Sequence, residues 1–355
     1  MVKMTPQQRM ISARRGQKPD KLPIFSAANN SFICQYYGLE VEEYLSNADK
    51  CASSHKAFME EFGLDGCVVA SGYILYGCGP EMGVTWKFPG KDFPGFIEGP
   101  LTGENDLANI KVPKAPTGYF KHYLEIIERV SRYMGQTHAV TANILGPFAA
   151  ACFLRGIEQT LLDTAMNPTF FQRYMQLSPE LSTFFGRSVL ATGVPLTALN
   201  EIFLTPEMIS PDAYHRLILP WDEKVQEMLR PDVVPNIMGA FIGRPDDKKS
   251  QVAARARYRA FFGLCESLDD IMQAVEETTP EYYFPLTVSG RMLAEWEAGK
   301  ILRFLNEGLD YLINERSFTT HISLVSIQSE SQEKAFQISK KLQAIKAFRD
   351  EYKIP

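Results

Sequence analysis

The sequence lacks several features that would assign it at once to a class of protein. Its six cysteines form no CxxC pair, so a disulfide framework is not expected and the thiols should stay reduced. It has no run of about 18 apolar residues and no apolar signal-peptide core in its first 20 residues. We therefore predict a soluble, cytoplasmic protein that does not enter a membrane.

An excess of positive charge is also absent. The chain has 37 Lys and Arg residues against 42 Asp and Glu residues, and its formal net charge is -5. Without a basic stripe, nucleic-acid binding is excluded as the main function. The glycines at 77–83 and 239–244 match neither GxGxxG before a helix nor a P-loop, so nucleotide binding has no support.

What is present is the pattern of one large α/β domain covering residues 1–355. Strand-like β-branched runs alternate with helical patterns, which indicates a parallel sheet. The eight candidate strands are 21–26, 65–71, 138–145, 194–203, 232–241, 258–266, 282–289 and 317–326. Eight such units predict a single (β/α)8 barrel of the TIM type.

Several local signals refine this prediction. Residues 1–20 predict a helix ahead of the first strand, and the final helix should begin with a capping box of Ser329 and Gln332. Residues 72–120 are rich in Gly, Pro and aromatics and leave the carboxyl end of the second strand, where barrels carry active sites. This long loop predicts a lid or pocket wall, with a small structural hairpin as the alternative.

Three stretches together resemble the uroporphyrinogen decarboxylase superfamily. They are "MTPQQRMISARRGQKPDKLPI" from residue 4, "ILGPFAAACFLRGIEQTLLDTAMNPTFFQRYMQL" from residue 144 and "EIFLTPEMISPDAYHRLILPWDEKVQEML" from residue 201. The resemblance implies a single (β/α)8 barrel, in agreement with the strand count. It is more specific for the fold than for the activity.

The chain departs from the decarboxylases of that superfamily. Their arginine-rich loop after the first strand is missing, because no basic residue occurs between Lys21 and Lys50. The aspartate expected after the second strand is missing too, and Ser71, Tyr73 and Tyr76 occur there. Decarboxylation of a tetrapyrrole is therefore not expected, and a decarboxylase for a smaller substrate stays as an alternative.

The superfamily's corrinoid-dependent methyltransferases offer a second comparison. Those that methylate a thiol carry His-x-Cys-Gly at the end of the fifth strand, where this chain has "NIMG". Asn236 then replaces the zinc-binding histidine and Met238 replaces the cysteine, and "THISLVSIQSE" near the eighth strand also lacks a cysteine. An amide and a thioether are poor zinc ligands, so no zinc site is expected.

These departures imply the methyltransferase component of a corrinoid-dependent O-demethylase. It would move a methyl group from a small aromatic methyl ether to cob(I)alamin, a cobalamin cofactor carried by a partner corrinoid protein. The barrel would orient the ether and help the phenolate to leave by hydrogen bonding or proton donation. The oligomeric state stays open, with a homodimer among the options.

Leaving-group assistance selects the candidate catalytic residues, for which a buried acid or a tyrosine at the carboxyl rim is suitable. These are Glu201, Tyr76 and His321, with an ion pair or a cap on the next helix as the alternative for Glu201 and a core role for His321. The candidate substrate-binding residues are Asn29, Tyr73, Phe148, Asn236, Met238, Phe241, Glu266 and Arg291. Glu266 could instead stabilise a helix start, and Arg291 could form a structural ion pair.

Two further alternatives are kept. Zinc could bind through other, atypical ligands, such as Glu201, Cys265 and His321. A barrel that binds its ligand without turnover is the alternative outside enzymes.

Overall fold

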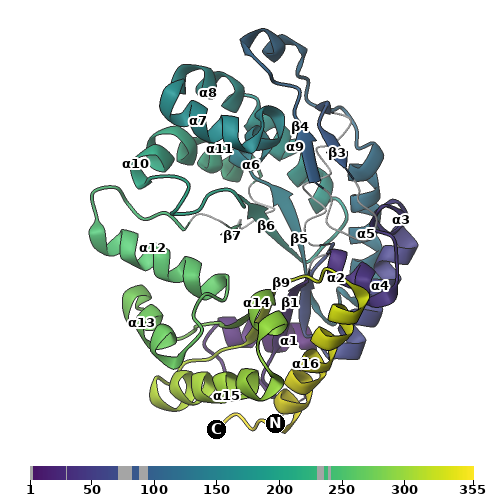
Figure 1. Ribbon diagram of the computed structural model, residues 1–355, viewed down its shortest axis with the longest axis vertical. Coiled ribbons are helices and arrows are strands. Elements are labelled where there is room, and N and C mark those ends of the chain that lie inside the picture. Colours follow the sequence, from purple (N-terminus) through teal and green to yellow (C-terminus); the bar gives the residue numbers. More distant parts are fainter. Residues whose placement is uncertain (1–2, 29, 71–81, 88–94, 230–235, 239–240) are drawn as a thin grey trace.

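A sheet of seven parallel strands forms the centre of the molecule, with helices around it (Figure 1). The computed structural model describes residues 3–28, 30–70, 82–87, 95–229, 236–238 and 241–355. The strands are β1 (Ile24–Ala28), β2 (Gly66–Val68), β5 (Ala139–Leu145), β6 (Leu196–Asn200), β7 (Asn236–Met238), β8 (Leu286–Ser289) and β9 (Ile322–Ile327). Their order in the sheet is β7-β6-β5-β2-β1-β9-β8, and every neighbouring pair is parallel.

This order confirms the predicted α/β barrel class. The strands follow their order in the chain, and the last strand, β9, pairs with the first, β1, as a barrel requires. The helices are α1 (Pro6–Arg14), α2 (Asn30–Tyr37), α3 (Val41–Ser46), α4 (Ala48–Phe62), α5 (Gly118–Met134), α6 (Pro147–Arg155), α7 (Ile157–Met166), α8 (Pro168–Met175), α9 (Ser178–Leu190), α10 (Pro211–Ala213), α11 (Leu219–Leu229), α12 (Lys248–Phe261), α13 (Leu268–Thr278), α14 (Gly290–Glu295), α15 (Ala298–Leu309) and α16 (Gln332–Glu351). Among the described helices, none is both long and apolar enough to cross a bilayer.

One predicted strand, 258–266, is wrong. Its first four residues end helix α12, and the rest connect α12 to α13, so the described sheet has no strand between β7 and β8. The aromatic residues that suggested a strand lie along a helix instead. Tyr258 and Phe262, four residues apart, bring their ring centroids to 4.9 Å. Asp247, whose side chain accepts from the Lys249 N–H, begins this helix.

The final helix carries the predicted apolar stripe, but its N-cap lies two residues after the predicted one. Ser331, not Ser329, is the N-cap, because its side chain accepts from the Lys334 N–H at 3.3 Å. The stripe residues Ala335, Ile338, Leu342 and Ile345 are all buried. They pack α16 against the rest of the barrel.

The segment 72–120 contains a two-stranded hairpin beside α6. Strands β3 (Thr85–Lys87) and β4 (Gly95–Glu98) pair antiparallel, and a 3-10 helix, Glu104–Asn109, follows them. Trp86 of β3 and Phe96 of β4 contact Phe153 of α6 at centroid distances of 5.4 and 6.1 Å. The hairpin is thus fixed to α6, and its role as a lid or pocket wall stays a prediction.

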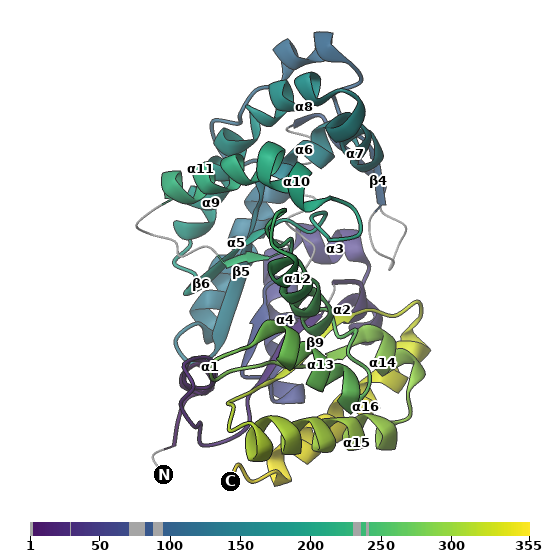
Figure 2. The same ribbon diagram turned by 90° about the vertical axis from the view of Figure 1, so that its left-hand side faces the viewer.

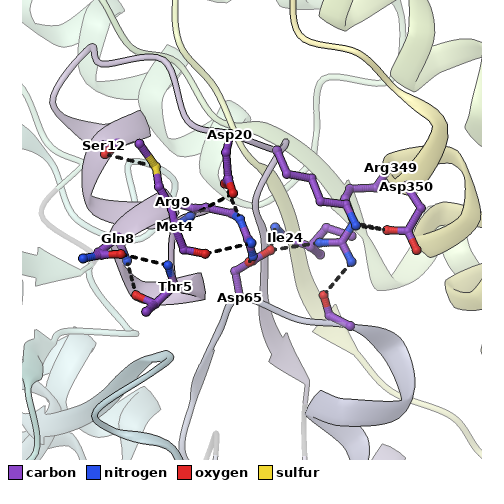
Figure 3. Close-up of polar contacts among 12 residues, drawn as sticks. Met4, Thr5, Gln8, Arg9, Ser12, Asp20, Ile24, Asp65, Arg349 and Asp350 are labelled. Carbon is purple, nitrogen blue, oxygen red and sulfur yellow. Dashed lines mark hydrogen bonds and ion pairs between the residues drawn. The ribbon is translucent and has the colours of Figure 1, made fainter. Parts of the chain in front are cut away.

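At the amino end of the barrel, Asp65 joins the two ends of the chain (Figure 3). Its carboxylate accepts from Arg9 of α1 at 2.8 Å, from Arg349 of α16 at 3.1 Å and from the Ile24 N–H at 2.9 Å. Arg9 also pairs with Asp20 at 2.6 Å. Both termini lie at this end of the molecule (Figure 2). One buried carboxylate therefore connects the first helix, the first strand and the last helix.

Replacing this carboxylate tests its contribution. Asp65→Asn leaves Arg349, which is 4% exposed, and Arg9 without their shared counter-charge. We expect the free energy of unfolding to fall by about 3 kcal/mol, because breaking a buried ion pair leaves a buried charge without its counter-charge.

Urea denaturation would measure the loss, with Asp350→Asn as the control. Asp350 also pairs with Arg349, but its side chain is 42% exposed, so its removal should cost only about 0.5 kcal/mol. Equal losses in the two variants would contradict the assignment.

Candidate functional site

The predicted catalytic residue Glu201 follows the last residue of β6, at the carboxyl end of the strand. Its side chain is completely buried. Its two carboxyl oxygens accept from the Phe148 and Ala149 N–H groups, at 2.8 and 2.7 Å. These N–H groups belong to the first turn of α6 and have no partner within that helix. Glu201 therefore caps α6, a helix that precedes it in the chain, whereas the alternative expected from the sequence was a cap on the helix that follows it.

Gly146 makes this cap possible. It is the N-cap residue of α6 and has no side chain with which to cap the helix. A Cβ atom at Gly146 would lie 2.2 Å from Cδ of Glu201. Any larger residue would occupy the place of the carboxyl group, so the glycine and the glutamate form one unit.

A second acid, Asp222 of α11, is buried with Glu201. Asp222 is completely buried, and the Tyr214 hydroxyl donates to its Oδ2 at 3.3 Å. Burial raises the pKa of Glu201 well above its usual value, and the charge and hydrogen bond of Asp222 raise that pKa further. Burial raises the pKa of Asp222 to about 7. We conclude that this carboxyl pair retains a proton at neutral pH.

Sequence reasoning missed Asp222, Tyr214 and Gly146. Asp222 occurs in "LPWDEK", which reads as the exposed face of a helix. The available signal was the proline in that stretch, because a proline interrupts the regular hydrogen bonding of a helix. A π-helical turn, Tyr214–Ile218, directly precedes α11. Such turns are frequent at functional sites.

His321 lies away from this pair. It precedes the first residue of β9, at the amino end of the barrel, so its expected position at the carboxyl rim was wrong. Its Nδ1 is 2.7 Å from the Tyr283 hydroxyl, and its ring stacks on Tyr283 with centroids 5.8 Å apart. Burial lowers the pKa of His321 to about 3, with a further contribution from the charge of Arg14. These contacts match the alternative core role.

Glu266 and Arg291 contact each other. Arg291, in the first turn of α14, forms an ion pair with Glu266, which is the structural alternative expected for Arg291. Arg291 also lines a cleft of about 730 Å³ beyond the carboxyl ends of β8 and β9, with Ser31, Gly290 and Gln328. Two substrate-binding candidates are thus close together at the rim. Their binding role stays a prediction.

The two phenylalanine candidates pack with other aromatic residues. Phe148 is completely buried against Phe171, with centroids 6.2 Å apart. Phe241, after β7, is half-buried beside Tyr258 at 5.6 Å and Phe261 at 5.5 Å. The structure gives both residues packing roles and does not bring them together.

The remaining candidates lie wholly or partly outside the described residues. Asn29, Tyr73 and Tyr76 are outside them. Of Asn236 and Met238, only the main chain is described, and β7 pairs Asn236 with Ala198 and Met238 with Asn200.

No group of three His, Cys, Asp or Glu side chains in the described residues could hold a metal ion. The atypical set of Glu201, Cys265 and His321 is therefore wrong. Glu201 and His321 lie at opposite ends of parallel strands.

Comparison with known proteins gives a consistent set of relatives. The family model described as uroporphyrinogen decarboxylase (URO-D) matches residues 5–243. Methylcobamide:CoM methyltransferase MtbA of Methanosarcina mazei is 21% identical over 236 residues, which are 65% of this chain and 68% of that protein. MtaA of Methanosarcina barkeri, with the same description, is 20% identical over 228 residues, 61% and 65% of the two chains.

A solved structure has the same fold over its whole length. This methyltransferase from Methanosarcina mazei superposes with a TM-score of 0.75, at 17% sequence identity. The match covers 98% of this chain and 99% of the other. The similarity therefore extends through α16, beyond the residues matched by the family model.

The carboxyl pair predicts a specific dependence of stability on pH. Because the folded-state pKa of Asp222 is about 7, above its ordinary value, the stability that it contributes is present below about pH 4 and is lost as the pH rises to 7. Asp222→Asn removes this titration. We expect the variant's free energy of unfolding, relative to that of the unmodified protein, to increase by about 2 to 3 kcal/mol when the pH is raised from 5 to 8.

Urea denaturation at both pH values measures this gain. Glu227→Gln, on the exposed side of the same helix, is the control and should change little. A difference between Asp222→Asn and the unmodified protein that is the same at pH 5 and pH 8 would refute the shared proton.

Proposed function

The chain belongs to the uroporphyrinogen decarboxylase (URO-D) family, and we propose that it is a corrinoid-dependent methyltransferase. The similarity to two methylcobamide:CoM methyltransferases carries this proposal. The decarboxylase activity of the family's name is disfavoured by the absence of basic residues between Lys21 and Lys50, where a polycarboxylate would need them. A partner protein would carry the corrinoid.

More narrowly, we propose that the chain works on the methyl-donor side, as the methyltransferase component of an O-demethylase. The relatives are named for a thiol acceptor, coenzyme M. Activating a thiol calls for a zinc site, and the donor chemistry of Asn236 and Met238 does not fit zinc. A methyl ether as donor and a reduced corrinoid as acceptor make that site unnecessary.

The reaction transfers one methyl group by in-line displacement. The reduced corrinoid, carried by the partner protein, would supply the electron pair for the new bond to the methyl carbon. The carbon–oxygen bond of the aromatic ether breaks, and its electron pair leaves with the phenolate oxygen. The barrel has to align the ether, and a proton has to reach the departing oxygen.

Glu201 is our proposed source of that proton. The residue follows β6 at the carboxyl end of the barrel, where enzymes of this fold carry their catalytic groups. The raised pKa of its carboxyl group keeps the acid protonated, and Asp222 adjoins it. After transfer, the α6 N–H groups that contact Glu201 would stabilise the carboxylate.

The activity itself can be tested with purified protein. Methoxybenzenes are incubated with the protein and a cob(I)alamin-bearing corrinoid protein, and methylcobalamin is followed by its absorbance. We expect methylcobalamin to form from an aromatic ether. When methylcobalamin and coenzyme M are supplied instead, little methyl transfer to the thiol should occur.

Rapid methylation of coenzyme M with no ether cleavage would reject the donor-side assignment. Tight binding of an ether without any methyl transfer would instead indicate a barrel that binds its ligand without turnover.

The proton-donor role of Glu201 has a separate test. Glu201→Gln should lower kcat about 100-fold for ethers of ordinary phenols, because general acid catalysis contributes at least that much. For an ether of a nitro-substituted phenol, which leaves without protonation, the loss should be small.

Stopped-flow absorbance compares the two substrates, and Glu207→Gln, exposed in the loop after β6, is the control. Equal losses for the two ethers would mean that Glu201 acts only as the cap of α6.

A further inference from the structure

Two buried asparagines lie near the carboxyl ends of neighbouring strands. Asn143 belongs to β5 and Asn200 is the last residue of β6. Their exposed fractions are 4% and 6%. Neither was among the residues expected from the sequence to bind substrate.

The register of the sheet places both side chains on one face. Asn143 pairs with Ala198, and Leu145 pairs with Asn200. The residues between them, Ile144 and Leu199, also pair, so by alternation they face the opposite side.

Helix α9 identifies the outer face. A Cβ atom at Gly186 of α9 would lie 3.4 Å from Cγ2 of Ile144, so Ile144 faces the surrounding helices. Asn143 and Asn200 therefore face the interior of the barrel.

Their amide oxygens have no partner. Within the described part of the chain, neither Oδ1 of Asn143 nor Oδ1 of Asn200 has a hydrogen-bond partner. Buried amides are nearly always hydrogen-bonded, so an unbonded pair on an inner face indicates a place for a ligand. The two residues are diagonal neighbours on adjacent strands, within reach of one small group.

The main chain at Asn143 is held in place independently of any ligand. Strand β2 ends at Val68, which pairs with Thr141, so β2 does not pair with Asn143. The Tyr123 hydroxyl donates to the Asn143 carbonyl oxygen and accepts from its N–H, each at 3.1 Å. The strand that presents this amide is therefore already fixed, as a binding site requires.

We propose that Asn143 and Asn200 together bind a hydroxyl group of the substrate. A hydroxyl both donates and accepts, so it suits a carboxamide in either orientation. The inference rests on the proposed function, and it assigns the methyl donor to methoxybenzenes that also carry a free hydroxyl. The hydroxyl would donate its single proton to one amide oxygen and accept from the Nδ2 group of the other amide, whereas a fully methylated ether has no proton for either oxygen.

The first test measures ligand binding under conditions in which no turnover can occur. Calorimetry compares 2-methoxyphenol with 1,2-dimethoxybenzene, with no corrinoid present. We expect the hydroxylated compound to bind at least about tenfold more tightly, because a polar site rejects an analogue that lacks its hydrogen-bonding group.

Asn143→Leu and Asn200→Leu, which keep the approximate side-chain size, should each bring the two affinities to within about threefold. Thr197→Val, on the outer face of β6, is the matched control and should keep the preference. In the methyl-transfer assay, kcat/KM should show the same preference and the same loss of it.

Wild-type protein that binds the two compounds within threefold, or binds neither, overturns the proposal even if a variant fails to fold. Preference that survives in both leucine variants also overturns it. Selective binding without methyl transfer would reject the proposed function and leave this assignment standing.

Discussion

The buried carboxyl group of Glu201 is the interaction on which the carboxyl end of the barrel depends. It connects the end of β6 to the first turn of α6, and it adjoins Asp222 of α11. Helix α6 in turn carries the β3–β4 hairpin through Phe153. One acid, accommodated by Gly146, thus fixes the parts that surround the carboxyl end of β6. At the other end of the barrel, Asp65 has the corresponding role and joins the first and last helices.

Much of the fold could be predicted because its signals are local. Proline and asparagine at helix starts, and the apolar stripe of α16, depend on neighbouring residues only. The strand predicted at 258–266 failed because "YRAFF" has β-forming residues, whereas the helix is decided by Asp247 and by the packing of Tyr258 on Phe262. The position of His321 failed for a different reason. Its strand was found, but the boundary that places it before β9 could not be read from the pattern.

The candidate site was only partly accessible from the sequence. Glu201 stood out because an acid ended an apolar strand. Its contacts with Phe148 and Asp222 join residues far apart in the chain, and sequence spacing says nothing about them. Asn143 and Asn200 looked like ordinary strand residues, and only the register and the absence of partners among the described residues single them out. Buried polar groups become informative once their hydrogen bonds can be counted.

We propose that methyl transfer proceeds without the thiol-activating zinc, because Asn236 and Met238 are unsuitable zinc ligands. The most direct measurement is the zinc content of protein that is actively forming methylcobalamin from an aromatic ether, before and after treatment with a strong chelator. We predict far less than one zinc ion per chain and an unchanged rate. Stoichiometric zinc, together with activity that disappears on chelation and returns when zinc is added, would show that methyl transfer depends on zinc.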